Sequence, residues 1–342
     1  MKKGEKIMKK IVALILAIMT SLLILASCEN TNENVSNGGN EAVKTYKVGV
    51  VQYVSHPSLD NCYTGIAEAL TEKYGDKIEI TRQIGSDSSP DSDCATYAKQ
   101  FAAQDYDVIV PIATPAATSA FAAAEDKNIP VVFCAVSDPV AAGLVNSMDK
   151  PGFNCSGTSD VLDMEAQVNL IRAFQPDVLS IGVVYTTSEA NSITQLKNLE
   201  EEAEKYGINV ISAGIQNDAD IPSAATMVAS KVDCINNFTD NKVVNNLSVV
   251  LDAANEAGIP VYGSEIEQVK NGCLASVSID YVALGRVTGD IVSASLEGAN
   301  LEETAVKTIS DATPVVNTEV LEAFGMQLPD AYKDIETVET NK

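Results

Sequence analysis

The sequence predicts an α/β protein built of two lobes, each a doubly wound parallel sheet covered by helices on both faces. The main observation is an alternation: short apolar runs rich in β-branched residues alternate with stretches of helical periodicity. A second observation is length, because about 300 residues remain after the N-terminal segments, which is long for one core and suits two domains. The third is an internal repeat.

The repeat consists of three short motifs that recur in the same order and at nearly constant spacing. They are Val48–Val51 with Ile181–Val184, Glu72–Gly75 with Glu204–Gly207, and Ile129–Val131 with Ile259–Val261. A single match of this length carries no information, but three in order indicate two structurally equivalent halves.

Each half contains the same predicted elements. In the first half the strands are Tyr46–Tyr53, Ile78–Gln83, Val108–Ile112 and Val131–Cys134, and the helices are Tyr63–Tyr74, Asp91–Gln104 and Pro115–Lys127. In the second half the strands are Leu179–Tyr185, Asn209–Ala213, Cys234–Phe238 and Val261–Gly263, and the helices are Ile193–Tyr206, Pro222–Ser230 and Lys242–Ala257. Gly75 and Gly207 follow the first helix of each half, where glycine commonly ends a helix.

The N-terminus predicts a signal peptide over residues 1–27. Five lysines precede the apolar stretch Ile11–Ala26, and small residues lead to Cys28. The apolar stretch has about 16 residues, which is short for a membrane span. A cysteine at the cleavage point resembles the bacterial lipobox and predicts lipidation of Cys28; the alternative is an ordinary signal peptide with an incidental cysteine. The Asn- and Gly-rich segment 28–45 then serves as a flexible tether to the outer face of the cell membrane.

The charge and the cysteines exclude several classes of partner. With 23 Lys+Arg against 47 Asp+Glu the net charge is −24, which argues against binding nucleic acid. Beyond Cys28 six cysteines remain, none in a CxxC motif, and the single histidine leaves no metal-ligand pattern. We therefore expect buried free thiols, no metal and no cofactor.

Candidate binding residues lie in the loops that follow the strands, because ligands of such sheets bind at the carboxyl ends of the strands. Ser55–Asp60 and Ser188–Ser192 follow the first strands, and Thr114–Ala117 and Thr239–Asn241 follow the third. Their hydroxyl and amide groups lie beside helix starts, a natural carboxylate site, although plain N-capping is the alternative for each loop.

Two further loop residues have two interpretations each. Asp138, which follows the fourth strand, could pair with a ligand ammonium or cap the turn that begins at Pro139. His56 could hydrogen-bond to or stack on a ligand, or face solvent.

Several of these segments resemble one family of ABC-importer binding proteins, which includes lipoproteins that bind tryptophan and other aromatic amino acids. The matching segments are 49–52, 56–60, 113–117, 136–140, 142–145, 154–157, 182–185 and 189–192, and the resemblance runs from about Tyr46 to Pro329. Cys155 departs from the family pattern, which usually has Val or Ile before a Thr-Gly pair. The resemblance implies a type I periplasmic-binding-protein-like fold, an ABC importer permease as partner, and a small-molecule ligand.

The resemblance also implies a hinge of three segments, near Asn154–Thr158, Ala275–Asp280 and Ile309–Pro314. The N-terminal lobe would then comprise 46–154 plus 281–309, with the helix Leu284–Leu296 returning to it. The C-terminal lobe would comprise 158–275 plus 314–335, with Val320–Phe324 completing it.

The predicted ligand is an α-amino acid or similar small zwitterion, with an aromatic side chain as one option. Thr114, Ala116 and the helix start there would hold the carboxylate, and Asp138 or Asp280 the ammonium. The other predicted site residues are Gln52, Tyr53, His56, Asp60, Tyr185, Asn191, Ser192, Thr239 and Asp240. The absence of tryptophan leaves few stacking platforms for an aromatic or a sugar ring.

Other functions remain as alternatives. A nucleoside or sugar binder would use the same fold, and a sensor would need a separate signalling partner. A two-lobed racemase would need paired acid/base residues, but the repeat maps Cys134 onto Ser264. The sequence also has no GxSxG, no HExxH and no GxGxxG after the first strand, so we expect no enzyme.

Overall fold

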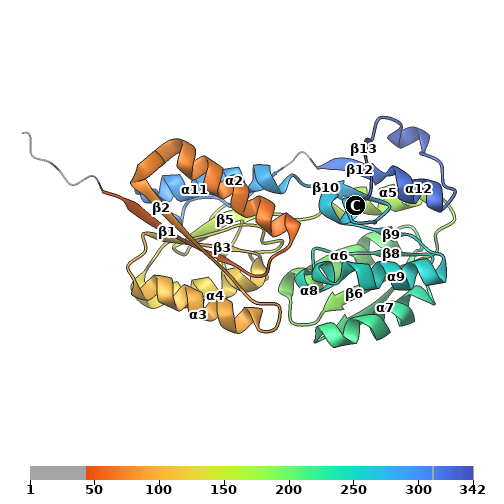
Figure 1. Cartoon of the computed structure of the whole chain (residues 1–342), viewed down its shortest axis with the longest axis horizontal. Coiled ribbons are helices and arrows are strands. Elements are labelled where there is room, and N and C mark those ends of the chain that lie inside the picture. The colour runs from red at the N-terminus through yellow and green to blue at the C-terminus, as the bar shows by residue number, and fades with distance from the viewer. Residues whose placement is uncertain (1–43, 310–311, 342) are drawn as a thin grey trace, which may run out of the picture. The chain divides into compact units, whose positions relative to one another are not determined.

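The first lobe is formed around a six-stranded sheet. The structure is a computed structural model that describes residues 44–309 and 312–341 (Figure 1). The sheet has the order β11-β5-β4-β3-β1-β2, and its registered pairs are all parallel. Its strands are β1 (Tyr46–Gln52), β2 (Ile78–Ile84), β3 (Val108–Ile112), β4 (Val131–Phe133), β5 (Cys155–Ser159) and β11 (Lys307–Thr308). The strand order reverses direction between β1 and β3, which is where doubly wound sheets bind ligands.

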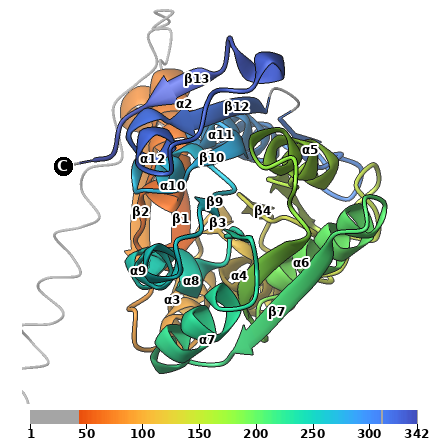
Figure 2. The ribbon, with the colours of Figure 1, turned by 90° about the vertical axis from the view of Figure 1, so that its right-hand side faces the viewer.

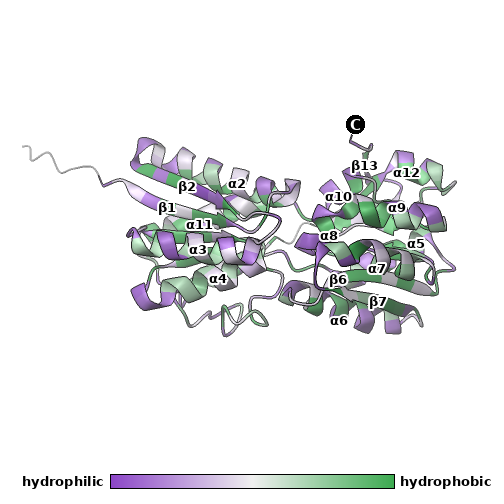
Figure 3. Cartoon of the chain, turned by 60° about the horizontal axis from the view of Figure 1, so that its bottom comes forward, coloured by the Kyte–Doolittle hydropathy of each residue, from purple (hydrophilic) through white to green (hydrophobic). Residues whose placement is uncertain are grey.

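Four helices cover this sheet. Figure 1 shows α2 (Pro57–Tyr74) and α11 (Tyr281–Leu296) on one face, and α3 (Pro90–Ala103) and α4 (Thr114–Ala124) on the other. The strands contribute continuous runs of buried residues, as expected of a parallel sheet covered on both faces. Figure 3 shows the resulting pattern, with apolar strands inside and polar residues on the outer helix surfaces.

The second lobe contains a four-stranded parallel sheet of order β7-β6-β8-β9 and a three-stranded sheet of order β10-β12-β13. The strands are β6 (Ser180–Thr186), β7 (Asn209–Ile215), β8 (Cys234–Asn236), β9 (Val261–Tyr262), β10 (Ala275–Ser278), β12 (Thr313–Asn317) and β13 (Glu336–Val338). Backbone bonds from Leu274 N to Val261 O and from Gly263 N to Ala275 O connect the two sheets. They therefore form one continuous layer.

Helices enclose this layer as well. Figure 2 shows α5 (Met164–Phe174) and α6 (Ala190–Glu204) on one side and α7 (Ile221–Ala229) and α9 (Leu247–Ala257) on the other. Shorter helices are α8 (Asn241–Asn245), α10 (Ile266–Lys270) and α12 (Thr318–Ala323), and four 3-10 turns lie at 75–77, 125–127, 218–220 and 330–332.

The predicted fold class, two doubly wound parallel-sheet lobes, is confirmed, with differences at particular elements. Helix α2 begins at Pro57, before the predicted Tyr63, because its polar first turn hides the helical period. The predicted helix Lys242–Ala257 is two helices that meet at Asn246. The first crossing is predicted near Asn154–Thr158, but Cys155–Ser159 form β5, which pairs with β4, so the chain leaves the first sheet only after Ser159.

The other two crossings are short. Residues 279–280 lead from β10 in the second lobe into α11 in the first, and residues 309–312 lead from β11 to β12, with 310–311 outside the described residues. Helix α11, which contains the segment Leu284–Leu296 expected to return to the N-terminal lobe, packs along α2.

Two predictions concern the cysteines and the N-terminus. All six cysteines of the described residues are buried and free, as expected. The predicted signal peptide, Cys28 and residues 28–43 of the predicted tether lie outside the described residues. Among the residues that are described, no helix is long and apolar enough to cross a membrane.

Candidate ligand-binding site

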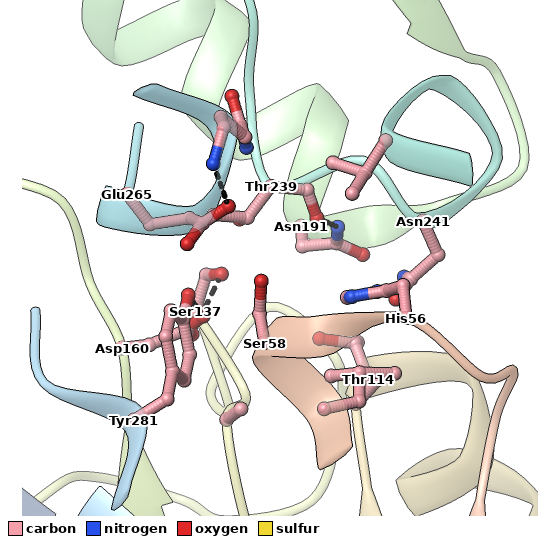
Figure 4. A pocket seen from close by; sticks show the side chains of 15 residues that line it. His56, Ser58, Thr114, Ser137, Asp160, Asn191, Thr239, Asn241, Glu265 and Tyr281 are labelled. Carbon is pink, nitrogen blue, oxygen red and sulfur yellow. Dashed lines mark hydrogen bonds between the residues drawn. The ribbon is translucent and has the colours of Figure 1, made fainter. Parts of the chain in front are cut away.

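A cavity lies between the two lobes, at the carboxyl ends of their strands; the empty space there, open solvent included, is about 360 Å³. Figure 4 shows its lining. The first lobe contributes His56, Ser58, Leu59, Ala113, Thr114, Ala135, Ser137, Asp160 and Tyr281, and the second contributes Asn191, Thr239, Asn241, Val244, Glu265 and Gln268. This is the edge of each sheet at which the strand-end rule places a ligand.

Two helix starts without side-chain caps face this cavity. Neither α2, with His56 at its N-cap, nor α4, with Ala113 at its N-cap, receives a side-chain hydrogen bond there. The first N–H groups of a helix have no partner within the helix, so these starts attract an anion. Ala113 and Ala135, at the ends of adjacent strands, both have positive φ, 81° and 56°. Such strain in non-glycine residues is concentrated at functional sites.

An acidic pair faces the cavity from opposite lobes. Asp160 accepts hydrogen bonds from the Ser137 and Tyr281 hydroxyls, each at 2.9 Å. Glu265 accepts the backbone N–H groups of Glu267 and Gln268 at 2.7 and 2.8 Å. Burial raises the pKa of Asp160, and it raises the pKa of Glu265 to about 7. Neither lysine nor arginine is among the described residues that line the cavity, so a bound cation would hold both carboxylates ionised.

The lobes also contact each other directly beside the cavity. The Gln195 amide of α6 donates to the Ser137 hydroxyl at 3.1 Å and to the Thr239 hydroxyl at 2.6 Å. The Thr194 hydroxyl donates to Asp138 at 3.2 Å. Because Ser137 also donates to Asp160, a contact across the cleft is linked to a cavity carboxylate.

Four of the predicted site residues line the cavity: His56, Thr114, Asn191 and Thr239. The others lie outside it. Asp138 accepts bonds from Ala141 N and Thr194, and exposed Asp280 caps α11 through Val282 N and Ala283 N. Neither predicted ammonium partner is therefore at the cavity, because local donors hold each carboxylate elsewhere.

The remaining predicted residues belong to supporting contacts. Asp240 accepts bonds from Thr186 and Ser192 behind the cavity wall. Gln52 and Asp60 bond to each other and to Arg82. Tyr53 and Ala116 are buried in the core of the first lobe, and Tyr185 packs on the core of the second.

Sequence reasoning missed Asp160, Glu265, Gln268 and Tyr281. Asp160 follows β5, a strand that was interpreted as a crossing, and Tyr281 opens α11 directly after another crossing. Glu265 follows β9, so the strand-end rule applied once more would have found it.

The fold and this cavity are those of a solute-binding protein whose two lobes enclose a small molecule. The chain belongs to the family of ABC transporter substrate binding proteins, whose model matches residues 47–335. This family comprises binding proteins that act outside the cytoplasm, and not enzymes.

Individual relatives are similar over most of the chain. A tyrosine-binding protein of Clostridioides difficile is 36% identical over 93% of this chain and 93% of its own. A structure from Streptococcus pneumoniae in complex with L-Trp is 36% identical, with a TM-score of 0.82 over 86% of this chain and 100% of its own. A ligand-free, open substrate binding protein from Clostridium difficile is 37% identical, with a TM-score of 0.67 over 87% of this chain and 100% of its own.

The two structural comparisons differ in TM-score at nearly equal sequence identity. The higher score belongs to the L-Trp complex and the lower to the ligand-free, open structure. In the present structure the lobes are joined by hydrogen bonds between Ser137 and Gln195 and between Asp138 and Thr194.

Proposed function

We propose that this protein is a lipid-anchored binding protein of an ABC importer and that its cavity binds an aromatic α-amino acid. The observation that carries the proposal is the pairing of an acidic end with uncapped helix starts inside one cavity. An α-amino acid presents the complementary pair of charges.

The ligand ammonium would lie between Asp160 and Glu265, which approach from opposite lobes. The carboxylate would lie beside the Ser58 hydroxyl in the first turn of α2, which Figure 4 shows between the acidic pair and His56. Because each lobe supplies one of the two carboxylates, a ligand bound in this way favours closure of the lobes.

The rest of the lining suits an aromatic side chain. Leu59, Ala113, Ala135 and Val244 are apolar. Similar proteins are described as tyrosine-binding or as complexed with L-Trp, which supports the same class.

The first prediction is direct binding. We expect L-tyrosine and L-tryptophan to bind the Cys28→Ser chain and to raise its melting temperature, because a ligand that binds only the folded state stabilises it by mass action, about 2.7 kcal/mol at 100 times its Kd. Calorimetry and a thermal-shift screen that includes nucleosides and sugars would test this. A shift with nucleosides or sugars alone would contradict the amino-acid assignment.

The second prediction concerns the anchor. The Lys-rich start, the apolar stretch and Cys28 support acylation of that thiol, and the family supports a location outside the cytoplasm. We expect the wild-type protein to partition into the detergent phase on Triton X-114 extraction and the Cys28→Ser variant into the aqueous phase. Equal partitioning of the two would contradict lipid attachment at Cys28.

A further inference from the structure

His56 is a buried side chain in the cavity, and its ring lies beside the Asn241 side chain. It is 9% exposed, and the approach of Asn241 lacks hydrogen-bond geometry, so neither ring nitrogen has a well-formed hydrogen bond among the described residues. Burial lowers its pKa to about 4, although the approach of Asn241 acts to raise that pKa, so the imidazole is neutral at physiological pH, with one N–H donor and one acceptor. A buried polar group without a partner is costly, which points to a partner supplied by the ligand.

Asn191 presents a second group of this kind from the opposite lobe. Its amide Nδ2 donates to Glu189 Oε2 at 3.1 Å and to the Thr239 carbonyl at 3.2 Å. These two acceptors fix the orientation of the amide and leave Oδ1, which is buried, without a partner among the described residues. Figure 4 shows the His56 ring and the Asn191 amide facing the same part of the cavity.

This part of the cavity lies away from the acidic pair. In Figure 4 Asp160, Tyr281 and Glu265 occupy one end, and His56 lies toward the other beside Asn241. If the ammonium binds at the acidic end, the far end of the ligand side chain reaches His56 and Asn191. This step rests on the proposed function.

We infer that His56 and Asn191 recognise a hydroxyl group at the far end of the ligand side chain and make the site selective for tyrosine. A phenol hydroxyl can accept the His56 N–H and donate to Asn191 Oδ1 at once, which satisfies both groups. An indole N–H can donate to only one acceptor, and a phenyl ring satisfies neither group. The expected order of affinity is therefore tyrosine, then tryptophan, then phenylalanine.

The test compares three ligands on three forms of the full-length protein in detergent. Calorimetry would give Kd values for L-tyrosine, L-tryptophan and L-phenylalanine on the wild type, His56→Phe and His56→Gln. We expect the wild type to favour tyrosine over phenylalanine by about 30-fold or more, since sites built for a hydroxyl discriminate strongly against its loss. In His56→Phe the ratio should fall to within about threefold, and His56→Gln, which keeps hydrogen-bonding capacity, should restore much of it.

The outcomes separate the inference from the proposed function. A wild type that binds phenylalanine as tightly as tyrosine overturns the inference and leaves the proposed function standing. Equal weakening of both ligands by His56→Phe would place His56 at the carboxylate that they share, and this also overturns the inference. A wild type that binds no aromatic amino acid overturns the proposed function itself. The wild-type ratio needs no variant, so the inference stays testable if a variant does not fold.

Discussion

Asp160→Asn is expected to weaken the binding of an aromatic amino acid by about 100-fold or more. Asp160 is buried, faces the cavity and accepts hydrogen bonds from Ser137 and Tyr281, which favour its ionised form. An asparagine would leave the ligand ammonium without a buried counter-charge on this lobe. Loss of one partner of a buried charge pair costs about 2–5 kcal/mol, and 1.4 kcal/mol corresponds to a factor of ten. Calorimetric Kd values for the wild type and the variant would measure the loss.

Asp280→Asn is the matched control for this substitution. It makes the same chemical change within a residue of Tyr281, but Asp280 is exposed and caps α11 through two backbone N–H groups. Asparagine caps helices about as well as aspartate, so the affinity should change by less than about twofold. Asp138→Asn tests the ammonium partner predicted from the sequence, which does not line the cavity. A larger loss in Asp138→Asn than in Asp160→Asn would place the ammonium at the residue that the sequence suggested.

The sequence predicts those strands whose buried faces are continuous and apolar. Val108–Ile112 is such a run, and its bounds in the structure are the predicted ones. Strand β5 is just as buried but reads Cys-Ser-Gly-Thr-Ser, because its polar side chains are bonded inside the lobe, Ser156 to the Thr304 carbonyl and Thr158 to Thr288. Hydropathy cannot reveal a strand whose core contacts are hydrogen bonds to residues more than a hundred positions away.

The prediction of site residues from the sequence is limited in a similar way. A position after a strand places a residue at the correct edge of the sheet, which suffices for Thr114 and Thr239. It does not determine where the side chain points. Asp240 has such a position, but its carboxylate turns back to the Thr186 N–H and hydroxyl and to Ser192. Whether a loop acid faces the cleft depends on donors from another strand, and these are known only once the fold is known.

Gly65→Leu is expected to lower the melting temperature by roughly 6–12 °C. A Cβ at Gly65 would lie 2.0 Å from the Val282 carbonyl oxygen, and one at Gly285 would lie 2.2 Å from the Cys62 carbonyl oxygen. Helices α2 and α11 therefore touch backbone to backbone, and a leucine must force them apart. Overpacking of this kind costs about 3 kcal/mol, and 1 kcal/mol corresponds to about 2–4 °C for a large domain. Calorimetric melting of the ligand-free protein would measure the shift.

Thr64→Leu is the control, because Thr64 is the preceding residue of α2 and is exposed. Its effect on the free energy of unfolding should stay within about 0.5 kcal/mol. Equal melting temperatures for the Gly65→Leu and Thr64→Leu variants would mean that α2 and α11 do not approach as closely as described. The same contact also bears on the ligand site, because Tyr281, the first residue of α11, donates to Asp160. Separation of the helices by Gly65→Leu should therefore weaken ligand binding as well as stability, whereas Thr64→Leu should change neither.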